Sequence, residues 1–427
     1  MKSRSLNRLL LLLMRYLPSG YHKPKLPNGQ YPPIDWQLYC FFGSCCWPLA
    51  ENVSKTHLII ELIIILFQFI SECMVSYGEF LGVLASGDDM SFACIALAPL
   101  LILLEMMLRT YNMIFKRNGF RKHWDEFYKR IYVEKSWQPE LFEQIRRLQL
   151  PTKYSTFTYI MTLVTYIYVP VRGLLEGERL LPFPSAYKFD YAASWLRYFT
   201  LLAMYIWTGI AVVGPLVAES NMLAMQVLHL NARYLLLLSD LRKISKEAIA
   251  AHNAHTEEDN IPLTQRFRLA LVDIIRRNLE LNNFAESLQS QYSFRIFIMM
   301  ALSATLLCVL GFLTATLGFT TTNIRFTCWI IGKIVELLIF GRLGTTLSTT
   351  TNDLSTSYYC CEWEDIIFHS TDSKENAKIM KLMALAIHLN SNPFKLSGLN
   401  FFYVNYTVVV SILKGAGSYF TVIYAYR

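Results

Sequence analysis

Lys333 and Glu336 are the residues whose types and spacing most directly suggest chemistry, because both are charged and both lie within an apolar run. A separation of three residues places them on one face of a helix, where the two charges can neutralise each other. Charged groups within a membrane-length segment are costly, and they usually face a cavity, an ion path or a partner helix. Two interpretations stay open from the residues alone, a structural ion pair and a pair at the edge of a ligand cavity.

No enzyme motif accompanies these charges. The sequence has no G-x-x-x-x-G-K-[ST] loop, no H-E-x-x-H, no paired C-x-x-C and no G-x-S-x-G elbow. The 8 histidines are scattered without the spacing of metal ligands, and the 9 cysteines suggest no disulfide framework. We therefore expect no enzyme activity, no metal site and no cofactor.

The composition indicates a membrane protein. Of 427 residues, 53% are hydrophobic and only 17% are charged, which is more apolar surface than one soluble core plausibly buries. Apolar runs of bilayer length lie at residues 54–78, 91–113, 154–174, 195–218, 293–318, 326–349 and 400–427. The sequence thus predicts an all-α membrane protein with seven transmembrane helices.

The distribution of lysine and arginine predicts the orientation, because positive charge near helix ends stays on the cytoplasmic side. With a cytoplasmic N-terminus, the cytoplasmic segments hold 29 of these residues and the external segments hold four, namely Arg179, Lys188, Arg325 and Arg427. The C-terminus is then extracellular. The net charge of +8 mostly reflects this topology, so the basic segment 116–153 does not indicate a nucleic acid partner.

The last apolar run, from Phe401 to Arg427, contains small and polar residues that are unusual in a helix surrounded by lipid. Gly415 and Gly417 leave one face without bulky side chains. Polar groups lie along the middle of the run, namely Asn405, Thr407, Ser411, Lys414 and Ser418. A helix that faces only lipid has no use for such groups. We expect this segment to face a cavity, a pore or a partner helix.

Four short motifs follow one another near the end of the chain: DLSTSYYCCEW at 353–363, PFKLSGLNFF at 393–402, SILK at 411–414 and SYFT at 418–421. In order and spacing they resemble the C-terminal signature of insect odorant receptors, the seven-helix ligand-gated cation channels of olfactory neurons. The resemblance is strongest over residues 350–427. It is weaker at GSCCWP (43–48) and at LPFPSAYKFDYAASW (181–195).

The resemblance implies that a small volatile organic ligand binds in the outer half of the bundle, among spans two, three, four and six. A mostly apolar cavity with aromatic walls suits such a ligand. Each candidate wall residue, taken singly, is more often a packing residue than a ligand contact. The candidates by depth are Phe92, Ile95, Thr162, Tyr166, Leu201, Tyr205, Trp329 and Lys333.

The resemblance also implies that the seventh helix lines a pore for permeant cations. Val422 would be the hydrophobic constriction that blocks ions by dewetting. Ser418, Val422 and Ala425 recur at intervals of four and three residues, as one helix face requires. The same face would include Tyr426 and Lys414. The alternative is that this stripe is only a contact between helices.

The predicted organisation is a cytoplasmic segment at 1–53, a six-helix ligand-binding region at 54–349 with cytoplasmic extensions at 219–292, a cytoplasmic anchor at 350–399 and the pore helix at 400–427. The amphipathic pattern at Ser373–Asn390 predicts a helix in the anchor, which could instead lie on membrane lipid. In the resembled family such extensions gather four subunits.

The segment between spans four and five is compact, whereas the family's co-receptor has a considerably longer one. We therefore expect a ligand-specific subunit that assembles with the olfactory co-receptor as a heterotetramer in the plasma membrane. A gustatory-type receptor channel is the first alternative, although its usual closing motif is replaced here by Ser-Tyr-Phe-Thr. A small-molecule transporter is less favoured, since the odd span number and the lack of evident repeats do not suit inverted repeats.

Overall fold

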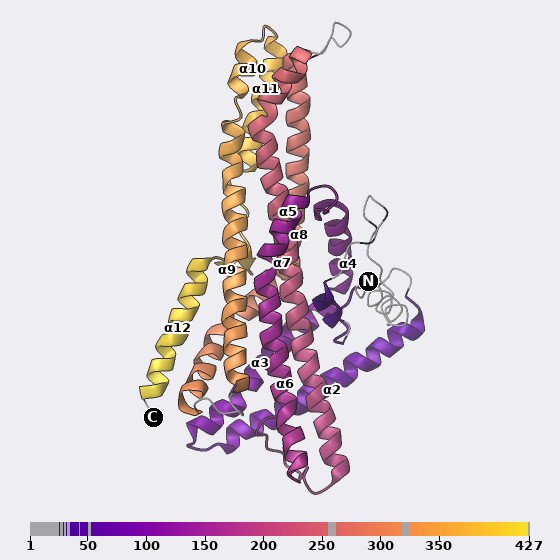
Figure 1. The fold of residues 1–427 in the computed structure, drawn as a ribbon, viewed down its shortest axis with the longest axis vertical. Coiled ribbons are helices and arrows are strands. Elements are labelled where there is room, and N and C mark those ends of the chain that lie inside the picture. Colours follow the sequence, from indigo (N-terminus) through magenta and orange to yellow (C-terminus); the bar gives the residue numbers. More distant parts are fainter. Residues whose placement is uncertain are drawn as a thin grey trace.

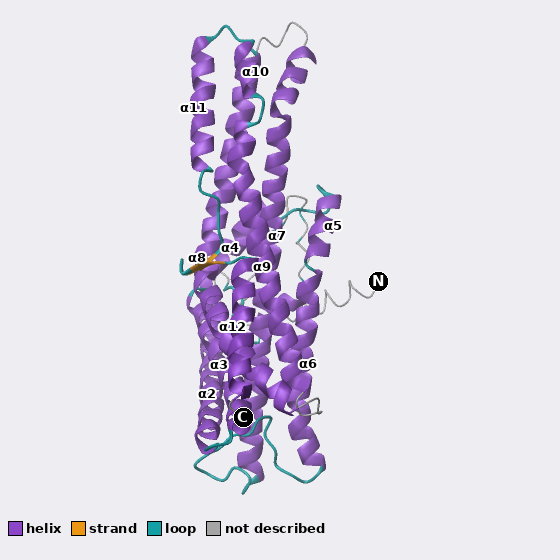
Figure 2. Ribbon diagram, turned by 90° about the vertical axis from the view of Figure 1, so that its left-hand side faces the viewer, coloured by secondary structure: helices purple, strands orange, loops and turns teal. Residues whose placement is uncertain are grey.

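The computed structural model describes residues 25, 29, 31, 35–41, 43–49, 53–254, 262–317 and 324–425. Helices dominate this part of the chain, and two short strands form the one sheet within it (Figure 2). The elements are, in chain order, η1 (Trp36–Phe41), α2 (Lys55–Ala85), α3 (Met90–Phe115), α4 (Arg117–Glu126), η2 (Phe127–Ile131), α5 (Pro139–Leu148), α6 (Leu150–Leu175), α7 (Trp195–Ala254), α8 (Leu263–Leu317), α9 (Ile324–Tyr359), α10 (Trp363–Phe368), α11 (Ser373–Leu389), β1 (Ser397–Gly398), β2 (Phe402–Tyr403) and α12 (Tyr406–Ala425). The prediction of an all-α fold is confirmed.

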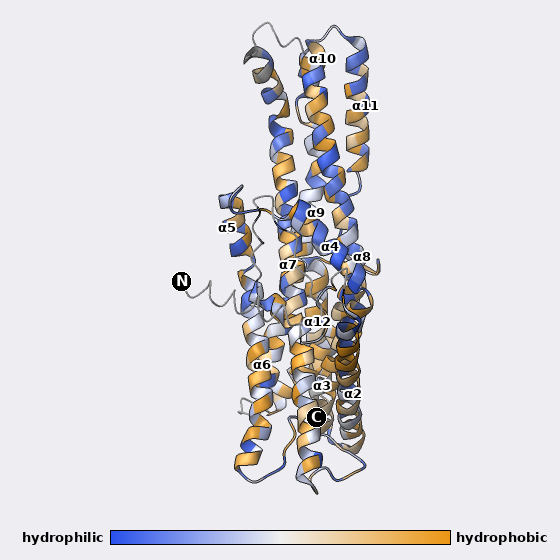
Figure 3. Cartoon of the chain, turned by 90° about the vertical axis from the view of Figure 1, so that its right-hand side faces the viewer, coloured by the Kyte–Doolittle hydropathy of each residue, from blue (hydrophilic) through white to orange (hydrophobic). Residues whose placement is uncertain are grey.

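Three helices run well past the length that a bilayer requires. Helix α7 has 60 residues and α8 has 55, so each is about 80–90 Å long at about 1.5 Å per residue. With α9 they form a narrow upper bundle that α10 and α11 complete, while α2, α3, α6 and α12 lie in the lower half (Figure 1). Figure 3 shows mostly apolar residues in the lower half and alternating polar and apolar residues in the upper bundle.

Five helices within the described residues are long and apolar enough to cross a membrane: α2, α3, α7, α8 and the segment Pro139–Leu175, which includes α6. Of the seven predicted spans, the remaining two correspond to α9 and α12. Lys333, Glu336 and Arg342 interrupt the apolar run of α9. Two of these side chains, Lys333 and Glu336, belong to the buried ion cluster described below.

The start of the last helix differs from the prediction. The apolar run from Phe401 was expected to be helical throughout, but α12 begins at Tyr406. Leu399 and Asn400 adopt left-handed backbone angles, with φ of 48° and 61°, and they turn the chain between β1 and β2. The side chain of Asn405 then accepts a hydrogen bond from the Val408 amide at 2.9 Å, which caps the helix start. The 20 residues of α12 still reach about 30 Å.

Helices α2 and α9 extend beyond the predicted spans at ends that carry charged residues. Helix α2 continues beyond residue 78 to Ala85, and α9 begins at Ile324 instead of 326. Glu79 and Arg325 therefore lie within helices, and both side chains are buried. Arg325, expected in the external segment before span six, is thus buried in the first turn of α9. The helix predicted at Ser373–Asn390 is confirmed as α11.

Candidate functional site

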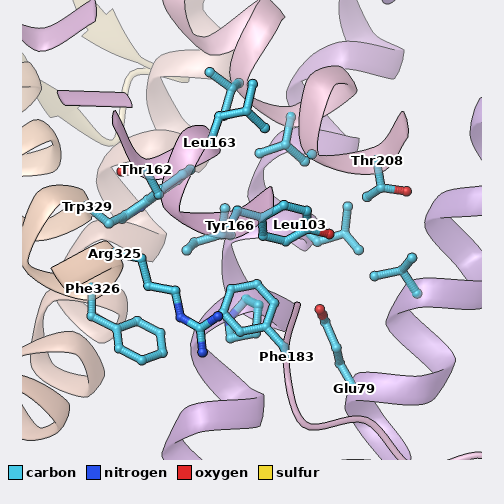
Figure 4. Close-up of a pocket in the computed structure, with 16 residues that line it drawn as sticks. Glu79, Leu103, Thr162, Leu163, Tyr166, Phe183, Thr208, Arg325, Phe326 and Trp329 are labelled. Carbon is cyan, nitrogen blue, oxygen red and sulfur yellow. The ribbon is translucent and has the colours of Figure 1, made fainter. Parts of the chain in front are cut away.

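A cavity lies between α2, α3, α6, α7 and α9, and the segment that joins α6 to α7 closes it (Figure 4). The volume of the cavity, measured as the space that the centre of a water-sized sphere can reach, is about 70 Å³. One water needs roughly 10–15 Å³ on the same measure. The wall is mostly aliphatic and aromatic. Its residues are Val75, Glu79, Pro99, Ile102, Leu103, Thr162, Leu163, Tyr166, Phe183, Thr208, Gly209, Val212, Val213, Arg325, Phe326 and Trp329.

The loop residue Phe183 covers the cavity and is held there from two sides. Its ring lies 5.4 Å from the ring of Tyr166 and 6.2 Å from that of Phe326, centroid to centroid. The same segment is tied to α2, because the Ala186 amide donates to the Gly78 carbonyl at 3.0 Å. The loop is therefore a fixed wall of the cavity, which shields an apolar ligand from water.

Arg325 brings a positive charge to this wall. Its Nη1 donates to the Pro182 carbonyl, and its guanidinium carbon lies 4.3 Å from the centroid of the Phe183 ring, a cation–π contact. No carboxylate lies within ion-pair distance of it among the described residues. Glu79 on α2 is also on the wall, and its Oε2 has no hydrogen-bond partner. Figure 4 shows Arg325 and Glu79 on different sides of the cavity.

Tyrosine hydroxyls connect the cavity to the neighbouring turn of α7. The Tyr166 hydroxyl donates to the Tyr205 carbonyl at 2.8 Å. The Tyr205 hydroxyl in turn lies 2.5 Å from Ser185 Oγ and 3.2 Å from the Tyr187 hydroxyl. These bonds fix the Tyr166 ring against the cavity, and they satisfy polar groups that would otherwise be buried without partners.

A second polar feature, a buried ion cluster, lies beside the cavity. Lys333 Nζ is 2.6 Å from Glu105 Oε1 and 3.1 Å from Glu336 Oε2. Arg109 Nη2 is 2.8 Å from Glu219 Oε2, while Arg109 Nη1 is 2.8 Å from Glu105 Oε1. The three acids and three bases of this ion cluster balance in charge. They are Glu105, Glu219, Glu336, Arg109, Arg295 and Lys333.

The ion cluster joins four helices, since its members come from α3, α7, α8 and α9. All six side chains are buried, so each charge depends on its partners for stabilisation that water cannot supply. The predicted pairing of Lys333 with Glu336 is confirmed. Glu105 pairs across helices, since its Oε1 lies 2.6 Å from Lys333 Nζ.

One aromatic contact connects the cavity with the ion cluster. Trp329 lines the cavity, and its ring lies 5.2 Å from that of Tyr159, centroid to centroid. The Tyr159 hydroxyl donates to Glu336 Oε2 at 3.1 Å. A ligand that displaces Trp329 would therefore act on Glu336 of the ion cluster through one intervening side chain, Tyr159.

The structure places three of the eight predicted ligand residues, Thr162, Tyr166 and Trp329, on the cavity wall. The other five lie elsewhere. Leu201 and Tyr205 are buried on α7 beyond the wall, and Phe92 and Ile95 are half-buried near the start of α3. Lys333 belongs to the ion cluster.

Several wall residues were not predicted from the sequence, among them Glu79, Phe183, Thr208 and Arg325. A charged residue next to an apolar run was the available signal for Glu79 and for Arg325. Both lie just outside the predicted spans 54–78 and 326–349, where Arg325 was expected in an external segment.

Three members of the ion cluster, Arg109, Glu219 and Arg295, were likewise not predicted. For Arg109 the available signal was Glu105, which lies four residues earlier in the same predicted span and pairs with it at 2.8 Å. Glu219 gave no such signal, since no oppositely charged residue lies three or four positions from it. Its partners come from α3 and α8, so only the packing of the helices reveals its role.

Two larger hollows lie in the upper bundle between α7 and α8. They are lined by charged side chains such as Arg233, Asp240 and Arg277. Those surfaces suit water more than an apolar ligand. The lower cavity is therefore the stronger candidate for binding a small organic molecule.

Helix α12 packs with one face and exposes the other. Val409 and Ala416 are buried against α8 and α9, and Phe420 lies against Gly311 of α8. Lys414, Ser418, Val422 and Ala425 are exposed, with Val422 at 49%. The predicted stripe thus lies on the free side of the helix in this single chain. Tyr426, predicted on the same face, is outside the described residues.

Two histidines near the membrane end of the upper bundle are neutral anchors. The Val133 amide donates to His229 Nδ1 at 2.9 Å, and burial lowers the pKa of His229 to about 3, with Arg233 adding to the effect. Burial likewise lowers the pKa of His123 to about 4. No group of three or more His, Cys, Asp or Glu side chains in the described part of the chain could hold a metal ion.

A sequence profile described as "7tm Odorant receptor" matches residues 89–417 of this chain. Two Drosophila melanogaster proteins are similar along nearly their whole length. Odorant receptor 74a is 34% identical over 95% of this chain and 99% of its own. Odorant receptor 35a is 29% identical over 93% of this chain and 96% of its own.

The fold is also similar to a solved structure, that of the insect olfactory receptor OR5 from Machilis hrabei in complex with eugenol. The TM-score is 0.72 over 92% of this chain and 98% of that one, at 11% sequence identity. A second structure of the same receptor gives a TM-score of 0.71. The membrane-length helices, the fold and the sequence of this chain all lead to the same conclusion. The chain belongs to the insect odorant receptor family, a family of multi-pass membrane receptors.

Proposed function

We propose that this chain is the odorant-binding subunit of a ligand-gated, non-selective cation channel, in which a small volatile molecule binds the cavity and α12 lines the pore. The N-terminus is cytoplasmic and the C-terminus extracellular. The subunit assembles with the olfactory co-receptor, most simply as a heterotetramer. The cavity between the membrane-length helices is the observation on which the proposal depends.

The cavity supports odorant binding through its size and its wall. It is bounded by apolar and aromatic side chains from five helices and covered by Phe183. Burial of apolar ligand surface in such a space supplies the main part of the binding free energy. A water-soluble, highly charged compound would gain little from the same wall.

The coupling of the cavity to α12 is the second support. Helix α9 contributes Trp329 to the cavity and Lys333 and Glu336 to the ion cluster. Further along, Gly341 of α9 lies so close to α12 that a Cβ there would be 2.9 Å from Val409 Cγ2. A ligand that binds more tightly to one arrangement of α9 shifts the population toward it. Helix α12 would move with α9 and withdraw Val422 from the pore.

The exposed face of α12 supports a shared pore. Lys414, Ser418 and Val422 are exposed in the isolated chain, and a face with a lysine is not suited to lipid. Copies of this face from several subunits would enclose a polar path with Val422 as its apolar constriction. The compact segment between the fourth and fifth spans, residues 218–292, favours a tuning subunit over the co-receptor.

Voltage-clamp recording tests the proposal in cells that express this chain with and without an olfactory co-receptor. Odorant-evoked cation currents that need both chains are the expected result. Saturable uptake of the odorant without channel currents would contradict the proposal and favour a transporter. Currents from this chain alone would retain the channel but contradict the heterotetramer.

A further inference from the structure

Four buried polar atoms of the cavity wall have no hydrogen-bond partner. They are Arg325 Nε, Trp329 Nε1, Thr208 Oγ1 and Glu79 Oε2. Each of these side chains is more than nine-tenths buried. A buried polar atom without a partner costs about 1–3 kcal/mol, so the occupied cavity is expected to supply partners for some of them.

The two nitrogen donors come from the same face of α9, because Arg325 and Trp329 are four residues apart. An arginine or tryptophan nitrogen can only donate a hydrogen bond. The group that satisfies them must therefore be an acceptor, such as the oxygen atom that many small volatile molecules carry. A hydrocarbon of the same shape would fill the cavity but leave both nitrogens without a partner.

The charges on the wall favour a neutral ligand. A carboxylate would be attracted to Arg325, but Glu79 lies on the wall of the same small cavity and would oppose a second negative charge. An ammonium group would be repelled by Arg325 in the same way. Figure 4 shows Arg325 and Trp329 on one side, with Glu79 and Thr208 on the other.

The oxygen of a carbonyl group fits the α9 side best, because it offers two lone pairs to two donors and needs no acceptor in return. The volume of the cavity restricts the rest of the molecule to a short apolar chain or a single ring. We infer that the cavity selects small neutral carbonyl compounds whose oxygen accepts hydrogen bonds from Trp329 Nε1 and Arg325 Nε. This inference rests on the proposed function.

The experiment compares three ligand series on cells that express this chain with the co-receptor. The first series is methyl alkyl ketones from methyl propyl to methyl heptyl ketone. The second has a methylene in place of each ketone oxygen, and the third has the corresponding carboxylates. We expect the most active ketone to reach half-maximal current at a concentration about 10–100-fold lower than its alkene, as one or two hydrogen bonds imply. The carboxylates should be weaker than the ketones.

Trp329→Phe keeps an aromatic ring beside Tyr159 and removes the donor. It should reduce the ratio of ketone to alkene potency by about tenfold, as the loss of one hydrogen bond implies. Trp207→Phe is the matched control, because Trp207 Nε1 also lacks a partner but Trp207 is not on the cavity wall. Its ketone preference should equal that of the parent.

Three results would overturn the inference: equal potency of ketone and alkene, an unchanged preference in Trp329→Phe at matched surface expression, or a silent ketone series in a channel that other volatiles open. The proposed function fails in a different way. In that case no volatile from a broad panel opens a channel formed by both chains at the cell surface, whatever its oxygen content.

Discussion

Lys333 Nζ on α9 lies 2.6 Å from Glu105 Oε1 on α3, and this ion pair is fully enclosed in the bundle. The pair joins two helices that both contribute to the wall of the cavity. Because Lys333 also contacts Glu336 at 3.1 Å, it holds together two carboxylates that would otherwise repel each other. The consequence is a cluster whose stability depends on its charge balance.

Removal of Lys333 should therefore be strongly destabilising. Lys333→Met leaves the ion cluster with one excess negative charge, and breaking a buried pair in this way costs about 3–5 kcal/mol. The double variant Lys333→Met/Glu105→Gln restores neutrality, and the amide oxygen that it introduces can still accept the hydrogen bond from Arg109 Nη1. We expect the melting temperature of the purified protein to fall in the single variant and to recover in part in the double variant. Equal melting temperatures for the single variant and the parent would show that the lysine is not needed for charge balance.

The gate prediction concerns Val422. Replacing Val422 with Ser should raise the resting current or alter ion selectivity, because a polar side chain at the constriction allows water to enter. Val410→Ser is the control, since Val410 is also exposed on α12 but lies about 120° around the helix from Val422. Recordings at matched surface expression decide the matter. Unchanged conduction in the Val422→Ser channel would remove this residue from the pore.

The contact between α9 and the start of α12 depends on a glycine. A Cβ at position 344 would collide with the carbonyl oxygen of Val404, which lies just before α12. Gly344→Ala should destabilise the protein by about 1–3 kcal/mol, the usual effect of overpacking. Gly415→Ala is the matched change on α12, where no atom lies within 4 Å of the added Cβ. Thermal unfolding in detergent should separate the two variants, and similar melting temperatures would contradict the close approach.

The stability of the upper bundle should depend on pH through His229. Burial lowers its pKa from 6.5 to about 3 in the folded protein, so between these values only the unfolded chain binds the proton. Stability should therefore fall as the pH drops below about 6.5, by up to about 1.4 kcal/mol per pH unit from this group. Melting temperatures measured from neutral to mildly acidic pH would show the slope.

His229→Asn is the variant for that measurement, because an amide oxygen can accept the hydrogen bond from the Val133 amide without titrating. The acid sensitivity of stability should be smaller in this variant than in the parent. His252→Asn serves as the control, since His252 is exposed on the same helix. If His229→Asn and His252→Asn lose stability equally with falling pH, the buried histidine is not the titrating group.

The sequence predicted those parts of the fold that depend on neighbouring residues. Spans of bilayer length, the amphipathic helix α11 and the pairing of Lys333 with Glu336 all follow from patterns within one segment. The start of α12 could not be placed in the same way. Leu399, Asn400 and Asn405 stop the apolar run from being helical at Phe401, and this local turn is hidden by the high hydrophobicity around it.

The tertiary structure decided which charges meet and which residues form the cavity. Arg109 and Glu219 are 110 positions apart in the chain, yet an Nε–Oε2 hydrogen bond of 3.0 Å joins them. Arg325, expected in an external segment, lies on the cavity wall because α9 begins before it and buries it against Phe183. The rotation of each helix about its axis and the packing between helices determine such contacts. Periodicity along one segment reports which face is apolar, but it does not report which residue of another helix that face will meet.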